Sequence, residues 1–248
     1  MDNSLLSLIL FIIMTVIFAI VKYFVGKKDN KSSDSSTSSI KIITLIYLGL
    51  VVLSQFFVNL NTTKKMCGIN QPLVAVMTTF IPWIFIFGSI NILLYALPGW
   101  KAPFSNTFGY LVAKIGGITS LFNKILTSDK QNKMIKEIYE DQSLVINEIT
   151  PANFDQFWLK FKEGNLLNSG ANTYKESLRN LVRLKDIVAE FMWFLFSGLL
   201  ISSISQNSIN NSTCYKNIDV MKKEHSTWEV KKNKKEKKKK KQIYYVRD

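Results

Sequence analysis

Residues 5–25 read LLSLILFIIMTVIFAIVKYFV, an apolar run that only Ser7, Thr15 and Lys22 interrupt. A helix of this length rises about 30 Å, the thickness of a bilayer's hydrocarbon core. A cleaved signal peptide is the competing interpretation. Residues 1–4 carry no positive charge, however, and the apolar core is too long for such a peptide. The run therefore predicts an uncleaved transmembrane helix.

Three further apolar runs meet or approach the same length. Residues 42–60 and 73–97 are long enough to cross a bilayer, and 187–204 just reaches the required length. A re-entrant or interfacial helix is the alternative for 187–204, where Glu190 lies near the start and within reach of lipid headgroups. We therefore expect an all-α integral membrane protein with three to four transmembrane helices, three of them within residues 1–97.

A few residues inside these predicted spans are polar or disrupt helices. Pro82 frees a backbone carbonyl and should kink the third span. Asn91 can hydrogen-bond another helix, a contact that contributes about 0.6 to 2 kcal/mol, or it can line a pore. Asn91, Gln55 and Glu190 are few polar groups for a transport pathway, and the sequence shows no inverted repeat.

The composition agrees with a membrane protein and excludes other classes. Aromatic residues make up 12% of the chain, which excludes a disordered protein, and 11 Gly, 5 Pro and 2 Cys exclude a collagen-like or disulfide-rich module. The single histidine, His225, stands among lysines. The sequence has no HExxH motif, no CxxC pair and no spaced Ser/His/Asp set. We expect no catalytic, cofactor-binding or metal-binding residues, no cofactor and no enzymatic activity.

The segments between the spans are polar. Residues 26–41 contain a serine-rich run, which predicts a flexible, solvated loop. Residues 98–186 predict a small helical polar domain. Its helices are expected near 134–140, at 150–164, and from about residue 173 directly into the fourth span.

One predicted helix of this domain carries an aromatic face. Gly164 should end this helix in a left-handed cap. Packing inside the domain is the default interpretation of the face, and insertion into the membrane interface is the alternative. The spacings of three, one and three fit a helical period for Phe154, Phe157, Trp158 and Phe161.

The segment after the third span combines helix-stopping, aromatic and polar residues. Pro98-Gly99 should stop the helix, and Trp100 with Lys101 should anchor it at the membrane interface. Pro103 and the polar residues after it favour a defined turn. The segment predicts an ordered exit loop, which either simply leaves the membrane or serves as a docking surface. Its candidate docking residues are Pro98, Gly99, Trp100, Pro103, Phe104, Asn106, Phe108 and Tyr110.

This stretch, placed after an apolar span and before a helical polar region, resembles membrane-spanning structural proteins of large icosahedral DNA viruses. The resemblance covers residues 70–120, and the use of Lys, Asn and Ile suits an AT-rich genome. It implies a virion inner-membrane or minor capsid-associated component, located in a host internal membrane and then in the virion membrane. Such a protein would link the membrane to a protein shell or to nucleic acid, with other membrane or capsid proteins as partners. The resemblance assigns no catalytic residues to this sequence.

The C-terminal segment, residues 205–248, is strongly basic. Twelve lysines and one arginine stand against five acidic residues, a net charge of +8. Such a run repels itself and predicts a disordered tail. It should attract nucleic acid or anionic lipid without reading sequence, because it lacks interleaved arginine and aromatic residues. The candidate polyanion-binding residues are Lys231, Lys232, Lys234, Lys235, Lys237, Lys238, Lys239, Lys240 and Lys241.

Two cysteines and the flanking charges bear on orientation. Cys67 and Cys214 fall on the same predicted side, so they form either a disulfide or two unrelated thiols. A disulfide needs an oxidising side or a dedicated oxidase. The positive-inside rule places the central domain in the cytosol, although the tail's own charge contradicts this. The charges that favour a cytosolic domain are Lys22, Lys27, Lys28, Arg179, Arg183 and Lys185.

These patterns lead to one expected function and one alternative. A structural multi-span membrane protein fits the exit loop, the helical domain and the basic tail. A small channel or transporter subunit of a cellular membrane is the alternative, but it needs polar groups along a shared pathway.

Overall fold

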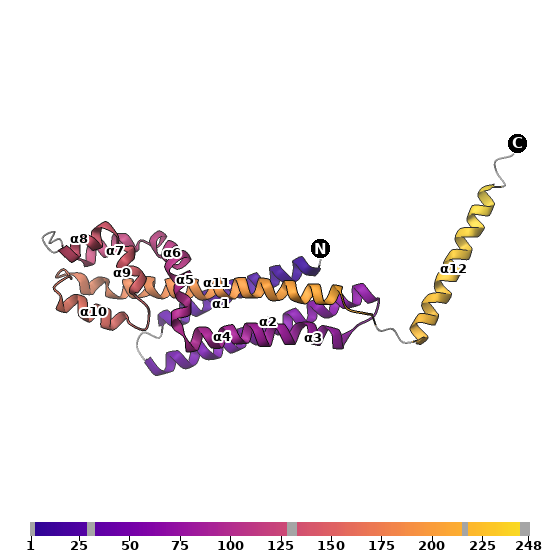
Figure 1. The fold of residues 1–248 in the computed structure, drawn as a ribbon, viewed down its shortest axis with the longest axis horizontal. Helices are drawn as coiled ribbons and strands as arrows, with labels where there is room; N and C mark the ends of the chain where they lie inside the picture. The colour runs from indigo at the N-terminus through magenta and orange to yellow at the C-terminus, as the bar shows by residue number, and fades with distance from the viewer. Residues whose placement is uncertain (1–2, 29–32, 128–132, 215–217, 244–248) are drawn as a thin grey trace.

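The computed structural model describes residues 3–28, 33–127, 133–214 and 218–243 (Figure 1). Nearly all of these residues are helical, and within them only an isolated bridge between Leu126 and Leu167 has β geometry. The α-helices are α1 Asn3–Lys28, α2 Ser33–Cys67, α3 Pro72–Pro82, α4 Gly88–Ala96, α5 Ala102–Phe104, α6 Tyr110–Ile115, α7 Ile118–Ile125, α8 Lys133–Glu140, α9 Ser143–Glu148, α10 Phe154–Glu163, α11 Lys175–Asn210 and α12 Ile218–Ile243. Short 3-10 turns are η2 Pro98–Lys101 and η4 Ala171–Tyr174, and π turns are η1 Trp83–Phe87 and η3 Ser105–Gly109.

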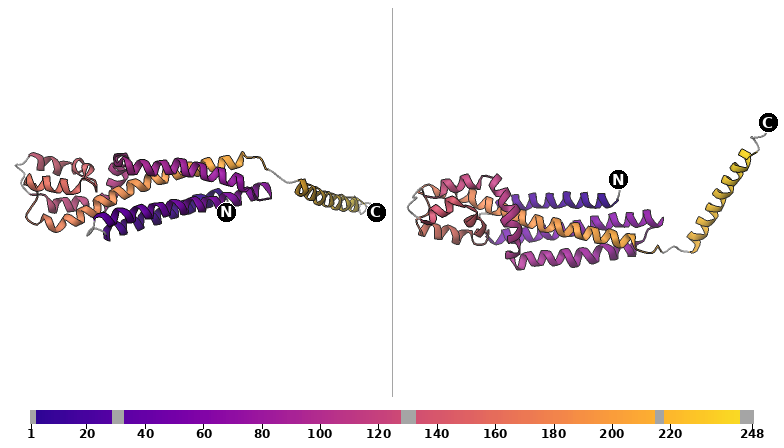
Figure 2. Two further views of the ribbon diagram at one scale, coloured as in Figure 1. Left: turned by 90° about the horizontal axis from the view of Figure 1, so that it is seen from below. Right: turned by 45° about the horizontal axis from the view of Figure 1, so that its top comes forward.

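Four long apolar helical segments form a bundle, visible from two sides in Figure 2. Within the described residues, the segments long and apolar enough to cross a membrane are 3–26, 39–67, 72–96 and 171–210. This confirms the predicted helical class and all four apolar segments. The fourth is much longer than the predicted 187–204, because α11 begins at Lys175 and crosses the predicted domain boundary.

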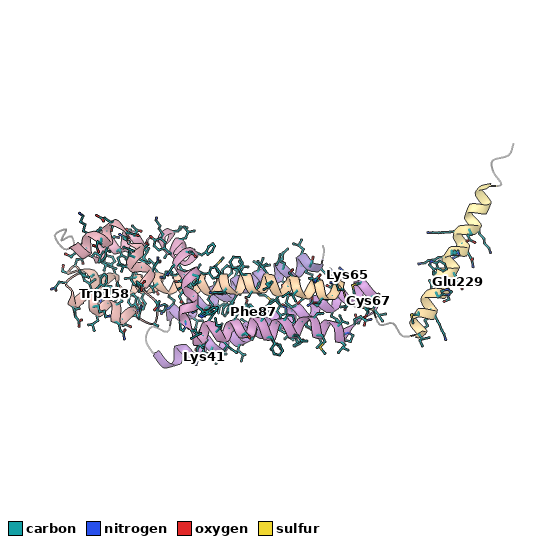
Figure 3. All side chains as sticks on the ribbon, viewed as in Figure 1. Lys41, Lys65, Cys67, Phe87, Trp158 and Glu229 are labelled. Atoms are coloured by element: carbon teal, nitrogen blue, oxygen red, sulfur yellow. A yellow bond between two sulfur atoms is a disulfide. The ribbon has the colours of Figure 1, made fainter. Side chains whose placement is uncertain are left out.

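The outside of the bundle is apolar and its centre is aromatic. Large apolar side chains such as Leu45 and Phe85 are exposed. Soluble monomers rarely expose so large an apolar surface to water. Inside, Phe11, Trp83 and Phe87 are fully buried, and their ring centroids lie 5.3 to 6.3 Å apart. Phe18, Tyr47 and Phe194 extend the same core along the bundle, and Figure 3 shows Phe87 near its middle.

The third span stays helical past Pro82. Pro82 has no N–H to give to the helical ladder, and the π turn η1 follows it directly. At the site of the predicted kink, the helix changes from α to π winding. Trp83 and Phe87 of the π turn are buried in the core.

A second core belongs to the head, the name used here for α6–α10, η4 and the first turns of α11. It includes Phe154, Trp158 and Phe161, so the aromatic face packs inside the head and does not lie in a membrane interface. Figure 3 shows Trp158 at this end of the molecule. The prediction of a left-handed cap at Gly164 was wrong. Gly164 has φ −75°, and the left-handed residue is Asn165 at φ 52°.

The predicted serine-rich loop at 26–41 was mostly wrong. α1 continues to Lys28, and α2 begins at Ser33, so only residues 29–32 lie outside the described part. Serine is only slightly worse than other residues in a helix. Once the apolar run has nucleated α2, each added polar turn costs little, because propagation is far easier than nucleation.

The predicted disorder of 205–248 was also wrong for the described part of this segment. α11 extends to Asn210, and residues 218–243 form α12, which projects away from the bundle in Figure 1. Lysine is a good helix former, a property that the charge argument left out. Local contacts add to it, with His225 Nδ1 3.8 Å from Glu229 and Lys232 Nζ 5.1 Å from the Trp228 ring. Residues 244–248 lie outside the described part.

Candidate functional site

Four charged side chains meet where the bundle joins the head, and we call them the charge clamp. Lys22 of α1 pairs with Glu190 of α11, and Lys101 of η2 lies 3.2 Å from Glu190 and 2.8 Å from Asp186. The charges thus alternate along a chain from α1 to η2 and α11. The Glu190 side chain is only 8% exposed, and the other three are also largely buried.

Burial makes the charge clamp a strong positional constraint. A buried charge without a partner is costly, whereas two cations and two anions in contact neutralise one another. Burial lowers the pKa of Lys101, but the nearby carboxylates Asp186 and Glu190 outweigh it and raise that pKa above its ordinary value. Lys101 therefore keeps its proton and its contacts at physiological pH.

This geometry corrects three predictions. Glu190 does not reach out to lipid headgroups, because Lys22 and Lys101 hold it inside the protein. Lys101 is not a free interfacial anchor either, since its ammonium group points to α11. Lys22 was also counted among the charges that determine orientation, yet it is neutralised within the fold.

The exit segment brings Lys101 to α11. Leu97 leaves helical geometry at φ −126° and ψ 77°, so α4 ends before Pro98. The chain then follows η2, α5 and η3 into α6, so the predicted loop is a series of short helical turns. Trp193 Nε1 donates a hydrogen bond of 2.8 Å to the carbonyl oxygen of Trp100 and fixes this path against α11.

The predicted docking residues divide into two groups. Phe104 packs on the rings of Trp193 and Phe196, with centroids 5.0 and 5.5 Å away, and is half-buried like Asn106 and Tyr110. The exposed group faces outward beside the charge clamp, and Trp100 keeps 48% of its surface exposed. Its members are Pro98, Gly99, Trp100, Pro103 and Phe108.

Close backbone contacts hold the same segment on α11. A Cβ at Gly109 would lie 2.5 Å from the carbonyl oxygen of Lys185, so only glycine permits this approach. The Lys185 side chain is buried in the head, and its Nζ donates hydrogen bonds to the carbonyl oxygens of Ile146 at 2.7 Å and Asn147 at 3.3 Å. A cation at the end of α9 suits the carbonyls there. The sequence prediction counted Lys185 only as a flanking charge.

At the opposite end of the bundle, hydroxyl and amide groups form a buried polar layer. Ser7 donates from its hydroxyl to Gln55, and Gln55 Nε2 donates to the Ser7 carbonyl oxygen at 3.0 Å. Asn59 Nδ2 donates to Thr79 at 2.8 Å, and Gln206 Nε2 donates to Asn59 at 3.1 Å. These bonds connect all four segments that are long and apolar enough to cross a membrane.

Three other polar residues inside the predicted spans also make hydrogen bonds. The hydroxyls of Tyr47 and Thr15 lie 2.8 Å apart within the aromatic core. Asn91 Nδ2 donates to the carbonyl oxygen of Phe87 at 2.9 Å, four residues back in its own helical segment. Its amide thus donates within its own helical segment and not to another helix.

A disulfide lies beside the polar layer. Cys67, the last residue of α2, is bonded to Cys214, with Cα atoms 5.4 Å apart, and Figure 3 shows Cys67 at the end away from the head. Of the two interpretations of these cysteines, the structure has the paired one. Asn61, Asn210 and Asn211, each the first residue of an Asn-X-Ser/Thr sequence, are exposed at this end.

The candidate polyanion-binding lysines lie on α12. Lys231 to Lys237 have exposed side chains, whereas Lys238 to Lys241 lie in the helix with side chains outside the described part. Among the described residues, no group of three or more His, Cys, Asp or Glu side chains could hold a metal ion.

Comparison with protein-family models, with curated proteins and with solved structures finds no match for this chain. The resemblance to viral membrane proteins therefore stays a prediction.

Proposed function

We propose that the protein is an integral membrane scaffold that presents the head rigidly on one side of a membrane and a basic helix on the other. The observation that carries this proposal is the continuity of α11. Leu178 and Val182 belong to the head core, and Phe194 and Ile201 of the same helix belong to the bundle core. At 1.5 Å per residue α11 is about 54 Å long, so it extends well beyond a hydrocarbon layer of about 30 Å.

The charge clamp supports the same function. It ties α1 and η2 to α11 at the point where the bundle meets the head, so the head cannot rotate freely on a linker. A tether for a mobile domain would need no such joint. Rigid presentation suits a protein that sets the position of a partner relative to a membrane.

The interior favours a scaffold over a channel or transporter. Fully buried rings of Phe11, Trp83 and Phe87 fill the centre of the bundle. On either side of them, Ser7 bonds to Gln55 and Thr15 to Tyr47. A pathway needs polar groups that face a shared water-filled space. The small channel or transporter subunit is therefore the second candidate.

The exposed residues beside the charge clamp are the proposed docking surface. Trp100 and Phe108 present aromatic area next to the head, a residue type enriched in protein interfaces. We propose a membrane or shell protein as the partner and, following the resemblance, a virion inner membrane as the setting. The head would face the cytosol, and the disulfide would face the opposite, oxidising side.

The test uses the full chain in cells and in liposomes. The scaffold predicts that the chain resists extraction by alkaline carbonate, dissolves in detergent, and leaves ion flux in liposomes at the protein-free level. Recovery in the carbonate-soluble fraction would exclude a membrane scaffold, and sustained conductance would favour the channel.

Protease added from the cytosol should cut in the head and spare residues 61–72, and the reverse pattern would invert the orientation. Stoichiometric copies in purified particles would support the virion setting.

A further inference from the structure

The first three turns of α12 carry an apolar stripe on one side. Ile218, Met221, His225 and Trp228 follow one another at spacings of three, four and three, which places them along one face of the helix. Ile218, Met221 and Trp228 are 63%, 48% and 56% exposed. Every described side chain of α12 is exposed, so this stripe has no partner within the described part of the chain.

The stripe leads into the lysine-rich half of the helix. Lys232 continues the face of Trp228 and holds its Nζ 5.1 Å from the indole ring. Lys222 and Lys223 flank the stripe, and the run from Lys231 onward surrounds the helix with positive charge. Three exposed apolar side chains beside a lysine-rich run offer α12 two kinds of contact with an anionic membrane surface, one to acyl chains and one to negative headgroups.

The disulfide places the start of α12 close to one end of the bundle. Cys214 is bonded to Cys67, the last residue of a helix long enough to cross a membrane. Four residue steps separate Cys214 from Ile218, so Ile218 lies within about 14 Å of the disulfide. The stripe is thus covalently held near the level where a bilayer surface would be.

We infer that α12 binds the anionic lipid surface on the disulfide side of the membrane. The stripe enters the interface with Trp228 at headgroup depth, and the lysines contact lipid phosphates and carboxylates. Nucleic acid would also attract the lysines, but phosphate neutralisation gives the stripe no role. The inference needs the bundle to cross a membrane whose leaflet on the disulfide side carries anionic lipid. It does not depend on the scaffold function of the head or on which side faces the cytosol.

The experiment compares the full chain in nanodiscs of phosphatidylcholine alone with nanodiscs that contain about 30% phosphatidylserine. The emission of Trp228 is obtained as the difference between the wild type and a Trp228→Phe variant. Trypsin cleavage within residues 218–243 is followed by mass spectrometry. With anionic lipid we expect a blue shift of the Trp228 emission and cleavage about tenfold slower, both reversed by high salt.

Matched variants separate the stripe from the charge. Ile218→Ser with Met221→Ser should abolish the blue shift while leaving Trp228 as reporter. Val230→Ser, the same kind of change two residues from Trp228 and on the other side of the helix, should leave it intact. Replacing the nine lysines of 231–241 by glutamine also removes most of the trypsin sites, so this variant is read by fluorescence alone and should lose the blue shift.

Three outcomes would overturn the assignment. The first is equal cleavage in both kinds of nanodisc. The second is a response that survives the change at Ile218 and Met221. The third is binding of an oligonucleotide by the full chain without any lipid response, which would assign α12 to nucleic acid. Carbonate extraction tests membrane insertion separately, so failure here leaves the scaffold proposal standing.

Discussion

The two ends of the bundle are held together in different ways. At the head end, buried charges connect α1, η2 and α11 through Lys22, Lys101, Asp186 and Glu190. At the other end, neutral hydroxyl and amide groups form the polar layer, and the Cys67–Cys214 disulfide closes it. The charged joint depends on all of its members, because each one leaves a buried charge behind when it is lost. The neutral joint spreads its stabilisation over many weak bonds and one covalent bond.

Glu190 should have the largest effect, because it contacts both cations. Glu190→Gln keeps the shape of the side chain but leaves Lys22 without its charge partner, so we expect a loss of about 3 to 5 kcal/mol in the free energy of unfolding. Denaturant unfolding in detergent measures this loss of free energy. The control is Asp155→Asn, which removes the ion pair with Arg179 at a carboxylate that is 66% exposed, and should cost about 1 kcal/mol or less. Equal losses in the two variants would refute the charge clamp as a buried joint.

The disulfide should come next. Replacing Cys67 and Cys214 together by serine should lower the free energy of unfolding by about 2 to 4 kcal/mol, because the bond closes a loop across most of the chain. Reduction of the wild type should give the same loss and should leave the double variant unchanged. Stability that does not respond to reductant would show that the polar layer holds this end alone.

A substitution in the core between the two ends tests how closely α1 and α11 are packed. A Cβ at Gly198 would lie 2.0 Å from Cζ of Phe11, so Gly198→Ala should cost about 1 to 3 kcal/mol by displacing that ring. Gly49 is the matched control, since a Cβ there meets nothing within 4 Å. Gly49→Ala should be neutral or slightly stabilising in its helix. A neutral Gly198→Ala would mean that α1 and α11 can separate without cost.

The polar layer should show the smallest effect. Ser7→Ala removes one hydroxyl that donates to Gln55, and we expect a loss of about 0.6 kcal/mol, the average for hydrogen bonds between membrane helices. Ser54→Ala is the control, because that hydroxyl donates only to the Val51 carbonyl oxygen of its own helix, at 2.8 Å. A loss at Ser7 as large as that at Glu190 would remove the difference between the two ends.

The sequence predicted the spans well because length and hydrophobicity decide them locally. The partners of Glu190 were missed because Lys22 and Lys101 lie far away in the chain. A signal did exist: Asn3, Ser7, Thr15 and Lys22 fall at helical spacings on one face of α1, and that polar face turns inward. The prediction for the tail failed for another reason. Charge repulsion was weighed without the helix propensity of lysine, and the described part of the tail is helical.

The length of α11 has a mechanical consequence. Because one helix belongs to both cores, the head must follow any change in the tilt of the bundle. Bilayers of different thickness impose different tilts on a helix, and roughly 24 Å of α11 extends past the hydrocarbon layer. Of this length about 18 Å lies on the head side of Ile187, so a change in tilt of about 10° carries the far end of α11 sideways by about 3 Å. The protein would translate membrane thickness into the lateral position of whatever its head holds.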